Sequence, residues 1–154
     1  MLPSHIHSGF KTVPDELIGL CRPHAWPQLT TPPAEGIRPI RDILLHTVRA
    51  EAFWLHHVVH GAPRPNADPE NFPSLDAILA VWRPQRDLSL AWIQGLSAAD
   101  RIETRPFPWD QSQRASIEDI VWHVVTHEQY HRGQVFTRLA LLGRRDLPDH
   151  DLLR

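Results

Sequence analysis

The segment whose residue types most clearly suggest chemistry is HEQYH, residues 127–131, where two histidines stand four positions apart. On an α-helix, residues i and i+4 lie about 6 Å apart along the axis, so two such imidazoles can share one metal ion. At about 100° per residue, His131 falls about 20° and His127 about 60° from the centre of the apolar stripe. His123 falls about 100° away. The spacing therefore predicts that His127 and His131 face the interior and that His123 does not.

A second group of histidines lies upstream, in a segment where apolar residues also recur with helical spacing. His46 falls about 60° and His57 about 40° from the apolar face of residues 43–58, so either can supply a third ligand. A single histidine near an apolar face is more often a hydrogen-bonded core residue than a ligand. Several neutral imidazoles buried without a metal, however, leave polar nitrogens that need other partners. The residues alone leave both interpretations open.

HEQYH also matches H-E-x-x-H, the zinc metalloprotease signature in which the glutamate acts as general base. The extended form of that motif needs a glycine and a histidine where this chain has Gln134 and Thr137. A glutamate ligand further along is excluded, because no glutamate follows Glu128. We therefore keep a metalloprotease only as a minor alternative.

Glu128 faces partly inward, about 40° from the centre of the stripe and on the opposite side from His127. It can act as a general base, or it can accept a hydrogen bond from a histidine that binds the metal. The alternative is an ion pair with Arg132, one helical turn later, worth a few tenths of a kcal/mol.

Three helices are expected to position these residues, and they occupy residues 38–60, 75–96 and 117–142. Ser74 and Ser116 precede the second and third of these helices and are suited to cap them. Gly143 is suited to end the last one. Pro84 is expected to kink the second helix or to split it in two.

The connections between the helices are long and rich in proline. Residues 61–74 and 97–115 have the composition of loops, and Ile102 and Thr104 hint at a short strand. The first 36 residues contain six prolines. We therefore expect an irregular N-terminal segment with only a short helix at about residues 15–21.

The chain of 154 residues has the length of one domain and a globular composition. We predict a single all-α domain in which residues 37–143 form the core of a helix bundle and residues 144–154 a tail. A net charge of −2 gives no general attraction for nucleic acid or anionic lipid, so we expect neither as a partner.

The expected location is the cytoplasm. No stretch approaches the roughly 18 apolar residues that span a bilayer. The first ten residues lack the basic start and apolar run of a signal peptide. A single cysteine, Cys21, cannot form an intramolecular disulfide and has no redox partner, so we expect no role for it at the site.

Residues 121–143, VWHVVTHEQYHRGQVFTRLALLG, closely resemble the final helix of DinB/YfiT-like proteins. The hallmark of that helix is H-x-x-x-H-R-G-Q followed by an apolar run and a glycine. Residues 41–61, RDILLHTVRAEAFWLHHVVHG, resemble the second, metal-binding helix of the family. The resemblance covers about residues 37–143, and the first 36 residues depart from the usual long first helix.

The resemblance implies a four-helix bundle, often dimeric, in which His46, His127 and His131 bind one divalent metal ion. Nickel or zinc is the ion most expected, with iron or manganese as alternatives. Three protein ligands leave a position open for water or substrate, as in catalytic sites. Arg132 and Gln134 belong to the family motif and are weak candidates for orienting ligands or binding substrate.

Members of this family with known activity include thiol-dependent transferases and isomerases. We therefore expect a metal-dependent transferase or hydrolase that acts on a small-molecule substrate, with a low-molecular-weight thiol as cosubstrate. The alternative is a non-catalytic metal-binding or stress-response protein. Trp54 and Trp122 are expected to serve packing, and Trp109 is not expected to line the pocket.

Overall fold

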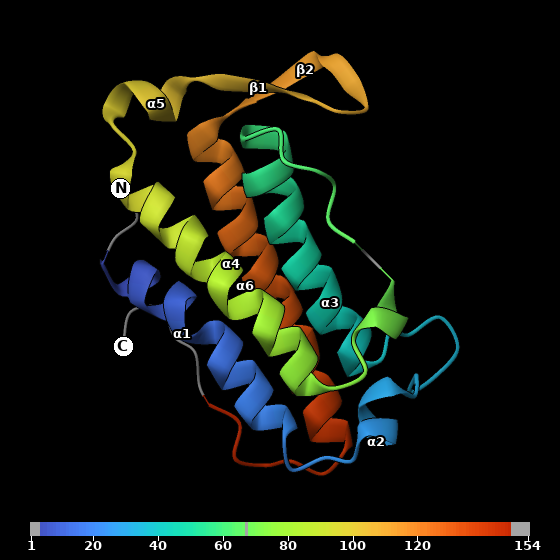
Figure 1. Cartoon of the computed structure of the whole chain (residues 1–154). Helices are drawn as coiled ribbons and strands as arrows, with labels where there is room; N and C mark the ends of the chain where they lie inside the picture. Colours follow the sequence, from blue (N-terminus) through green and yellow to red (C-terminus); the bar gives the residue numbers. More distant parts are fainter. Residues whose placement is uncertain (1–3, 67, 149–154) are drawn as a thin grey trace.

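The computed structural model describes residues 4–66 and 68–148, with side chains described from residue 8 onward, so part of the predicted tail lies outside it. The fold is mainly helical, which agrees with the predicted all-α class. Its long helical segments are α1 (Ser4–Cys21), α3 (Ile40–Glu51) with its π-helical continuation η1 (Ala52–Val59), α4 (Leu75–Gly95) and α6 (Ile117–Leu141). Helix α1 packs against α4 and helix α3 against α6, while α1 also contacts α6 and α3 contacts α4 (Figure 1).

Shorter elements connect these helices: α2 (Trp26–Thr30), the 3₁₀-helix η2 (Pro69–Asn71), α5 (Ala98–Ile102), β1 (Thr104–Phe107) and β2 (Asp110–Ser116). The two strands form an antiparallel hairpin that contacts η1 and the start of α6 at one end of the helices (Figure 1). The sequence only hinted at the first strand. The second, DQSQRAS, is mostly exposed and has no alternation of apolar and polar residues by which to recognise it.

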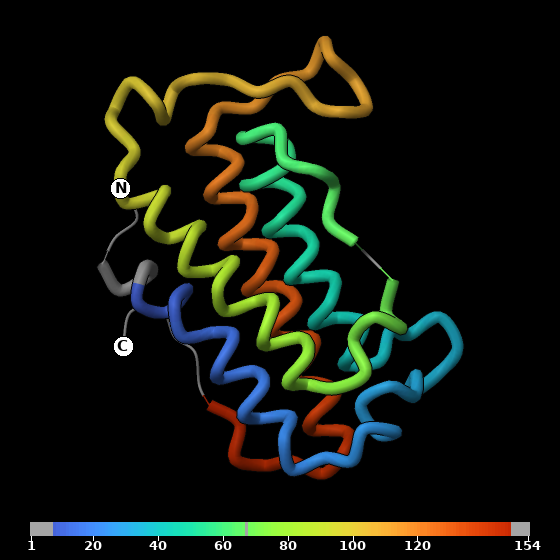
Figure 2. Tube along the Cα trace, viewed as in Figure 1, coloured from blue at the N-terminus to red at the C-terminus, as the bar shows by residue number. Residues whose placement is uncertain are grey.

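The prediction of an irregular N-terminal segment was wrong. Helix α1 has 18 residues and runs alongside α4 (Figure 2), with buried apolar side chains in the core. It continues through Pro14, whose missing N–H cannot bond to the carbonyl of Phe10 as it would in a regular helix. The guanidinium of Arg86, from α4, donates to that carbonyl instead. A tertiary hydrogen bond therefore replaces the backbone bond that the proline removes.

The predicted helix boundaries at the two serines are confirmed. The hydroxyl of Ser74 accepts a hydrogen bond from the Ala77 amide at 3.1 Å, and that of Ser116 from the Asp119 amide at 3.0 Å. Gly143, with φ of 94°, follows the end of α6 as predicted. Pro84 does not split its helix, because α4 is continuous from Leu75 to Gly95.

The π-helical segment η1 changes which side chains of the second predicted helix face the core. In a π-helix the hydrogen bonds join residues five apart, so the angular step per residue is smaller than in an α-helix. Leu55 and Val59 are buried, whereas Trp54 and Val58, which α-helical spacing placed on the apolar face, are only partly buried. Within the described residues, no helix is long and apolar enough to cross a membrane.

Candidate metal centre

Three imidazoles from two helices converge where α3 packs against α6. The Nε2 atom of His127 lies 3.1 Å from Nε2 of His46 and 3.1 Å from Nε2 of His131. One ring nitrogen from each of the three histidines lies within 4.8 Å of the others. The structure thus brings together the three residues that the family resemblance indicated.

The surroundings of the three rings keep them neutral. Burial lowers the pKa of His46 to about 4, with smaller contributions from the charges of His131 and two arginines. Burial also lowers the pKa of His127 to about 4, with help from the neighbouring histidines. The pKa of His131 is lowered as well, chiefly by burial. Neutral imidazole is the form that binds metal ions, so the cluster is ready for one at neutral pH.

A hydrogen bond orients one of these rings. Nδ1 of His131 donates to the side-chain oxygen of Gln134 at 2.8 Å. With its proton on Nδ1, a neutral imidazole carries its lone pair on Nε2, which is the atom that faces the cluster. Of the two weak candidates in the family motif, Gln134 therefore contacts a cluster histidine directly.

The donor atoms and two of the three nitrogen separations fit a divalent metal ion, and the third separation is within 4.8 Å. Two metal–nitrogen bonds of about 2.0–2.1 Å, meeting at angles of about 90–109°, separate their nitrogens by about 2.9–3.4 Å. The observed 3.1 Å separations lie within that range. Within the described residues no fourth histidine, cysteine or carboxylate joins the cluster. Three neutral nitrogen donors would leave a coordination position for another group.

The two other histidines considered from the sequence lie outside the cluster. His123 packs edge-on against Trp54, with 5.0 Å between ring centroids. His57, the alternative third ligand, donates from Nδ1 to the carbonyl of Ala62 at 2.6 Å. Cys21 is fully buried, and burial raises the pKa of its thiol to about 12, which disfavours the reactive thiolate.

A cavity of about 410 Å³ adjoins the cluster. Its lining residues are His46, Arg49, Ala50, Phe53, Trp54, Arg64, Pro65 and His127. Trp109, at the tip of the hairpin, stacks on Phe53 at 6.4 Å and packs edge-on against Trp54 at 5.7 Å, but is not itself part of the lining. The hairpin thus supports the aromatic wall of the cavity from outside.

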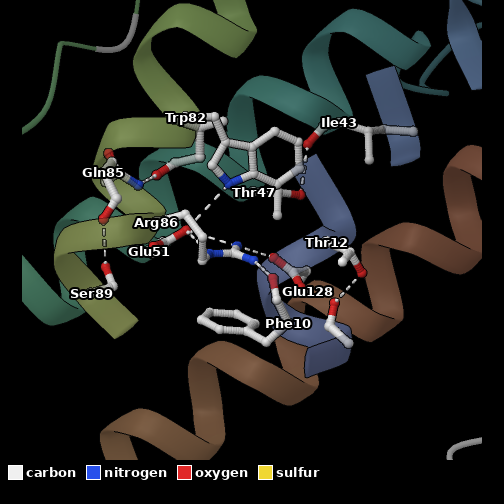
Figure 3. A network of polar contacts seen from close by, with 12 residues as sticks. Phe10, Thr12, Ile43, Thr47, Glu51, Trp82, Gln85, Arg86, Ser89 and Glu128 are labelled. Atoms are coloured by element: carbon white, nitrogen blue, oxygen red, sulfur yellow. Dashed lines mark hydrogen bonds and ion pairs between the residues drawn. The ribbon is translucent and has the colours of Figure 1, made fainter. Parts of the chain in front are cut away.

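A buried network of charges joins α4 to the two helices that carry the histidine cluster, α3 and α6 (Figure 3). Arg86, on α4, donates to Glu51 at 2.9 and 3.1 Å and also to Glu128. Its guanidinium carbon lies 3.5 Å from the centre of the Phe10 ring, and the Trp82 indole donates to Glu51 at 3.3 Å. All three charged side chains are almost fully buried. The network contains one positive and two negative groups.

The sequence analysis missed Glu51 and Arg86, although a signal for both was present. Arg86 follows Trp82 by four positions and precedes Ile93 by seven, which places it on the apolar face of its helix. Glu51 follows Thr47 by four positions, which places it near the apolar face of the preceding helix. A charged residue on the apolar face of one predicted helix, matched by an opposite charge on another, predicts a buried ion pair.

The environment of Glu128 differs from what the sequence suggested. Its carboxylate accepts from Arg86, whereas Arg132 donates to both oxygens of Glu16 at 2.7 Å. Burial raises the pKa of Glu128 to about 7; the charge of Arg86 opposes this shift and that of Glu51 adds to it. Glu128 is therefore engaged in the buried network and is not one of the residues of the histidine cluster.

Fold and site together define an all-α protein with a three-histidine cluster between two of its helices. A sequence model of the DinB superfamily matches residues 10–135, and the chain belongs to this superfamily. The solved structure of YjoA, a DinB-like protein from Bacillus subtilis, resembles this chain with a TM-score of 0.67 and 15% sequence identity. The match covers 94% of this chain and 96% of that one and concerns the fold alone. No curated protein matches the chain in sequence.

Proposed function

We propose that the chain binds one divalent metal ion through His46, His127 and His131 and acts as a metal-dependent transferase or hydrolase on a small molecule. The observation that carries this proposal is the convergence of three neutral ring nitrogens beside a cavity of about 410 Å³. Cavities of this size commonly hold small ligands. The family resemblance favours nickel or zinc over iron or manganese, and a low-molecular-weight thiol as cosubstrate.

The proposal includes the DinB/YfiT type of four-helix bundle, with α1, α3 and η1, α4 and α6 as its helices. In that arrangement a divalent ion supplies Lewis acidity and lowers the pKa of a water or thiol nucleophile. The chain's own residues hold and orient the ligand atoms: Gln134 accepts a hydrogen bond from His131, and Phe53 and Trp54 line the adjoining cavity.

Two alternatives are less well supported. A fourth protein ligand that closes the metal site would favour a non-catalytic metal-binding or stress-response protein. The described residues provide no such ligand. A metalloprotease needs Glu128 free to take a proton from the reacting water, but its carboxylate accepts from the buried Arg86. Both observations favour a small-molecule enzyme.

We also propose a homodimer formed through α6. Its exposed face carries an uncharged stripe over five helical turns, formed by Trp122, Thr126, Tyr130, Gly133, Thr137 and Leu141. Tyr130 is 66% exposed and Trp122, which we expected to pack, is 38% exposed. Helix faces without charge and with exposed aromatic residues are typical of interfaces. Analytical ultracentrifugation of the protein and of Tyr130→Lys tests this; a monomeric parent protein contradicts it.

The metal site is tested with alanine variants on one helix. His131→Ala removes a cluster nitrogen, so we expect zinc or nickel content, measured by elemental analysis after dialysis, to fall from about one ion per chain to nearly none. His123→Ala is the matched control, because His123 lies outside the cluster on the same helix, and it should retain the metal. Full metal content in His131→Ala would overturn the proposal. A panel of thiols and electrophiles, assayed with the metal-loaded protein, then tests turnover.

A further inference from the structure

The cavity beside the histidine cluster has a marked charge asymmetry. Its lining residues include two arginines, Arg49 and Arg64, and no aspartate or glutamate. The electrostatic environment of the cavity therefore favours an anion, and a divalent cation in the cluster would strengthen that preference.

Of the two arginines, Arg64 is available to bind a ligand. Arg64 is exposed and lies in the loop that follows η1, with its guanidinium carbon 5.8 Å from the centre of the Phe53 ring. Within the described residues, no carboxylate forms an ion pair with it at 4 Å or less. A guanidinium can bind a carboxylate through two parallel hydrogen bonds, which gives orientation as well as affinity.

The other side of the cavity is aromatic and uncharged, and it indicates that the rest of the ligand is apolar. Phe53 and Trp54 present aromatic surface to the cavity, and their rings meet edge-on at 5.3 Å. Trp109 and Phe107 of the hairpin pack behind them. Flat aromatic walls favour aromatic or other apolar groups in offset-stacked or edge-on contact.

We propose that the ligand of this cavity is a small carboxylate with a flat apolar body. Arg64 receives the carboxylate, and Phe53 and Trp54 receive the apolar body. This inference rests on the proposed function, because it names the substrate class of the same site. It goes beyond that function in assigning a binding role to Arg64, a residue outside the histidine motif.

The test compares two probes of nearly equal shape, phenylacetate and phenylacetamide, by isothermal titration calorimetry with the zinc-loaded full chain and with the metal-free chain. We expect phenylacetate to bind at least about tenfold more tightly than the amide, and this preference to shrink at high salt. Arg64→Gln should weaken phenylacetate binding about tenfold in both forms and leave the amide unaffected. Arg145→Gln is the matched control, because Arg145 is an exposed arginine four residues beyond the end of α6 and does not line the cavity.

The two proposals fail in different ways. Equal binding of the two probes, or unchanged phenylacetate binding in Arg64→Gln, overturns the carboxylate proposal even where elemental analysis shows one zinc ion per chain. A chain that takes up no metal overturns the proposed function, while the metal-free titrations still decide the role of Arg64. Phenylacetate binding to the zinc-loaded chain that is unchanged in Arg64→Gln assigns the carboxylate to the ion and overturns the role of the arginine.

Discussion

The carboxylates of Glu51 and Glu128 share a single buried guanidinium, that of Arg86. When all three groups are ionised, the network carries one uncompensated negative charge away from water. Within the described residues, Oε1 of each glutamate is buried without a hydrogen-bond partner. We expect Glu128→Gln to relieve this excess charge, because glutamine is similar in size and keeps an oxygen that can accept from Arg86.

The expected effect depends on pH. Because burial raises the pKa of Glu128 from 4.5 to about 7, the folded chain binds more protons at this residue between these values than the unfolded chain does. The free energy of unfolding contributed by Glu128 is therefore lost as the pH rises through this range. The full rise corresponds to on the order of 3 kcal/mol. We expect Glu128→Gln to match the parent protein near pH 5 and to be about 1–3 kcal/mol more stable at pH 8.

The assay is denaturant unfolding of the metal-free protein, with a chelator present, at several pH values from 5 to 8. Arg86→Met is the contrasting variant: it leaves two buried carboxylates without their cation and should lose about 3–5 kcal/mol at pH 8. A Glu128→Gln protein that is less stable than its parent by more than about 1 kcal/mol at pH 8 would refute the reasoning. That result would mean that ionised Glu128 stabilises the fold through its pairing with Arg86.

Three further predictions concern the cluster and the helix that carries most of it. Because burial holds the pKa of His46 and His127 near 4, bound metal should be retained at pH 6 and lost only as the pH falls towards 4. Dialysis at stepped pH with elemental analysis measures this, and loss already at pH 6 contradicts it. Gln134→Ala removes the acceptor that orients His131 and should weaken metal binding about 10–100-fold in a chelator competition; unchanged affinity argues against the orienting role. Ser116→Ala should lower the free energy of unfolding by about 1 kcal/mol, measured with denaturant, and a change near zero would show that the cap contributes little.

What could be predicted from the sequence was encoded locally. The serine caps and Gly143 act on their own helix ends, so their identities alone locate the boundaries. The pairing of His127 with His131 follows from helical geometry, since both residues belong to one α-helix. The choice of His46 came from the family resemblance, because the angles also allowed His57.

What could not be predicted depends on contacts between distant segments. Pro14 predicts a helix break unless another donor bonds to the carbonyl of Phe10, which the proline leaves without its backbone partner. That donor is Arg86, 72 positions after Pro14 in the sequence. His57 and Trp54 were placed by α-helical angles, whereas residues 52–59 form the π-helical segment η1, and His57 bonds to the carbonyl of Ala62. The hairpin strands are short and polar, so neither hydrophobic alternation nor propensity marks the second one.

The guanidinium of Arg86 has a consequence for how the molecule loses its structure. It projects from α4 and bonds to Phe10 on α1, to Glu51 at the end of α3 and to Glu128 on α6. If any one of these helices detaches, either a buried charged group or the carbonyl of Phe10 loses its hydrogen-bond partner. Partial unfolding therefore costs free energy whichever helix detaches first. Local fraying of α1 near Phe10 is thereby tied to global unfolding. Amide protons in the middle of α1 should then exchange with solvent as slowly as those of α6, as one cooperative unit.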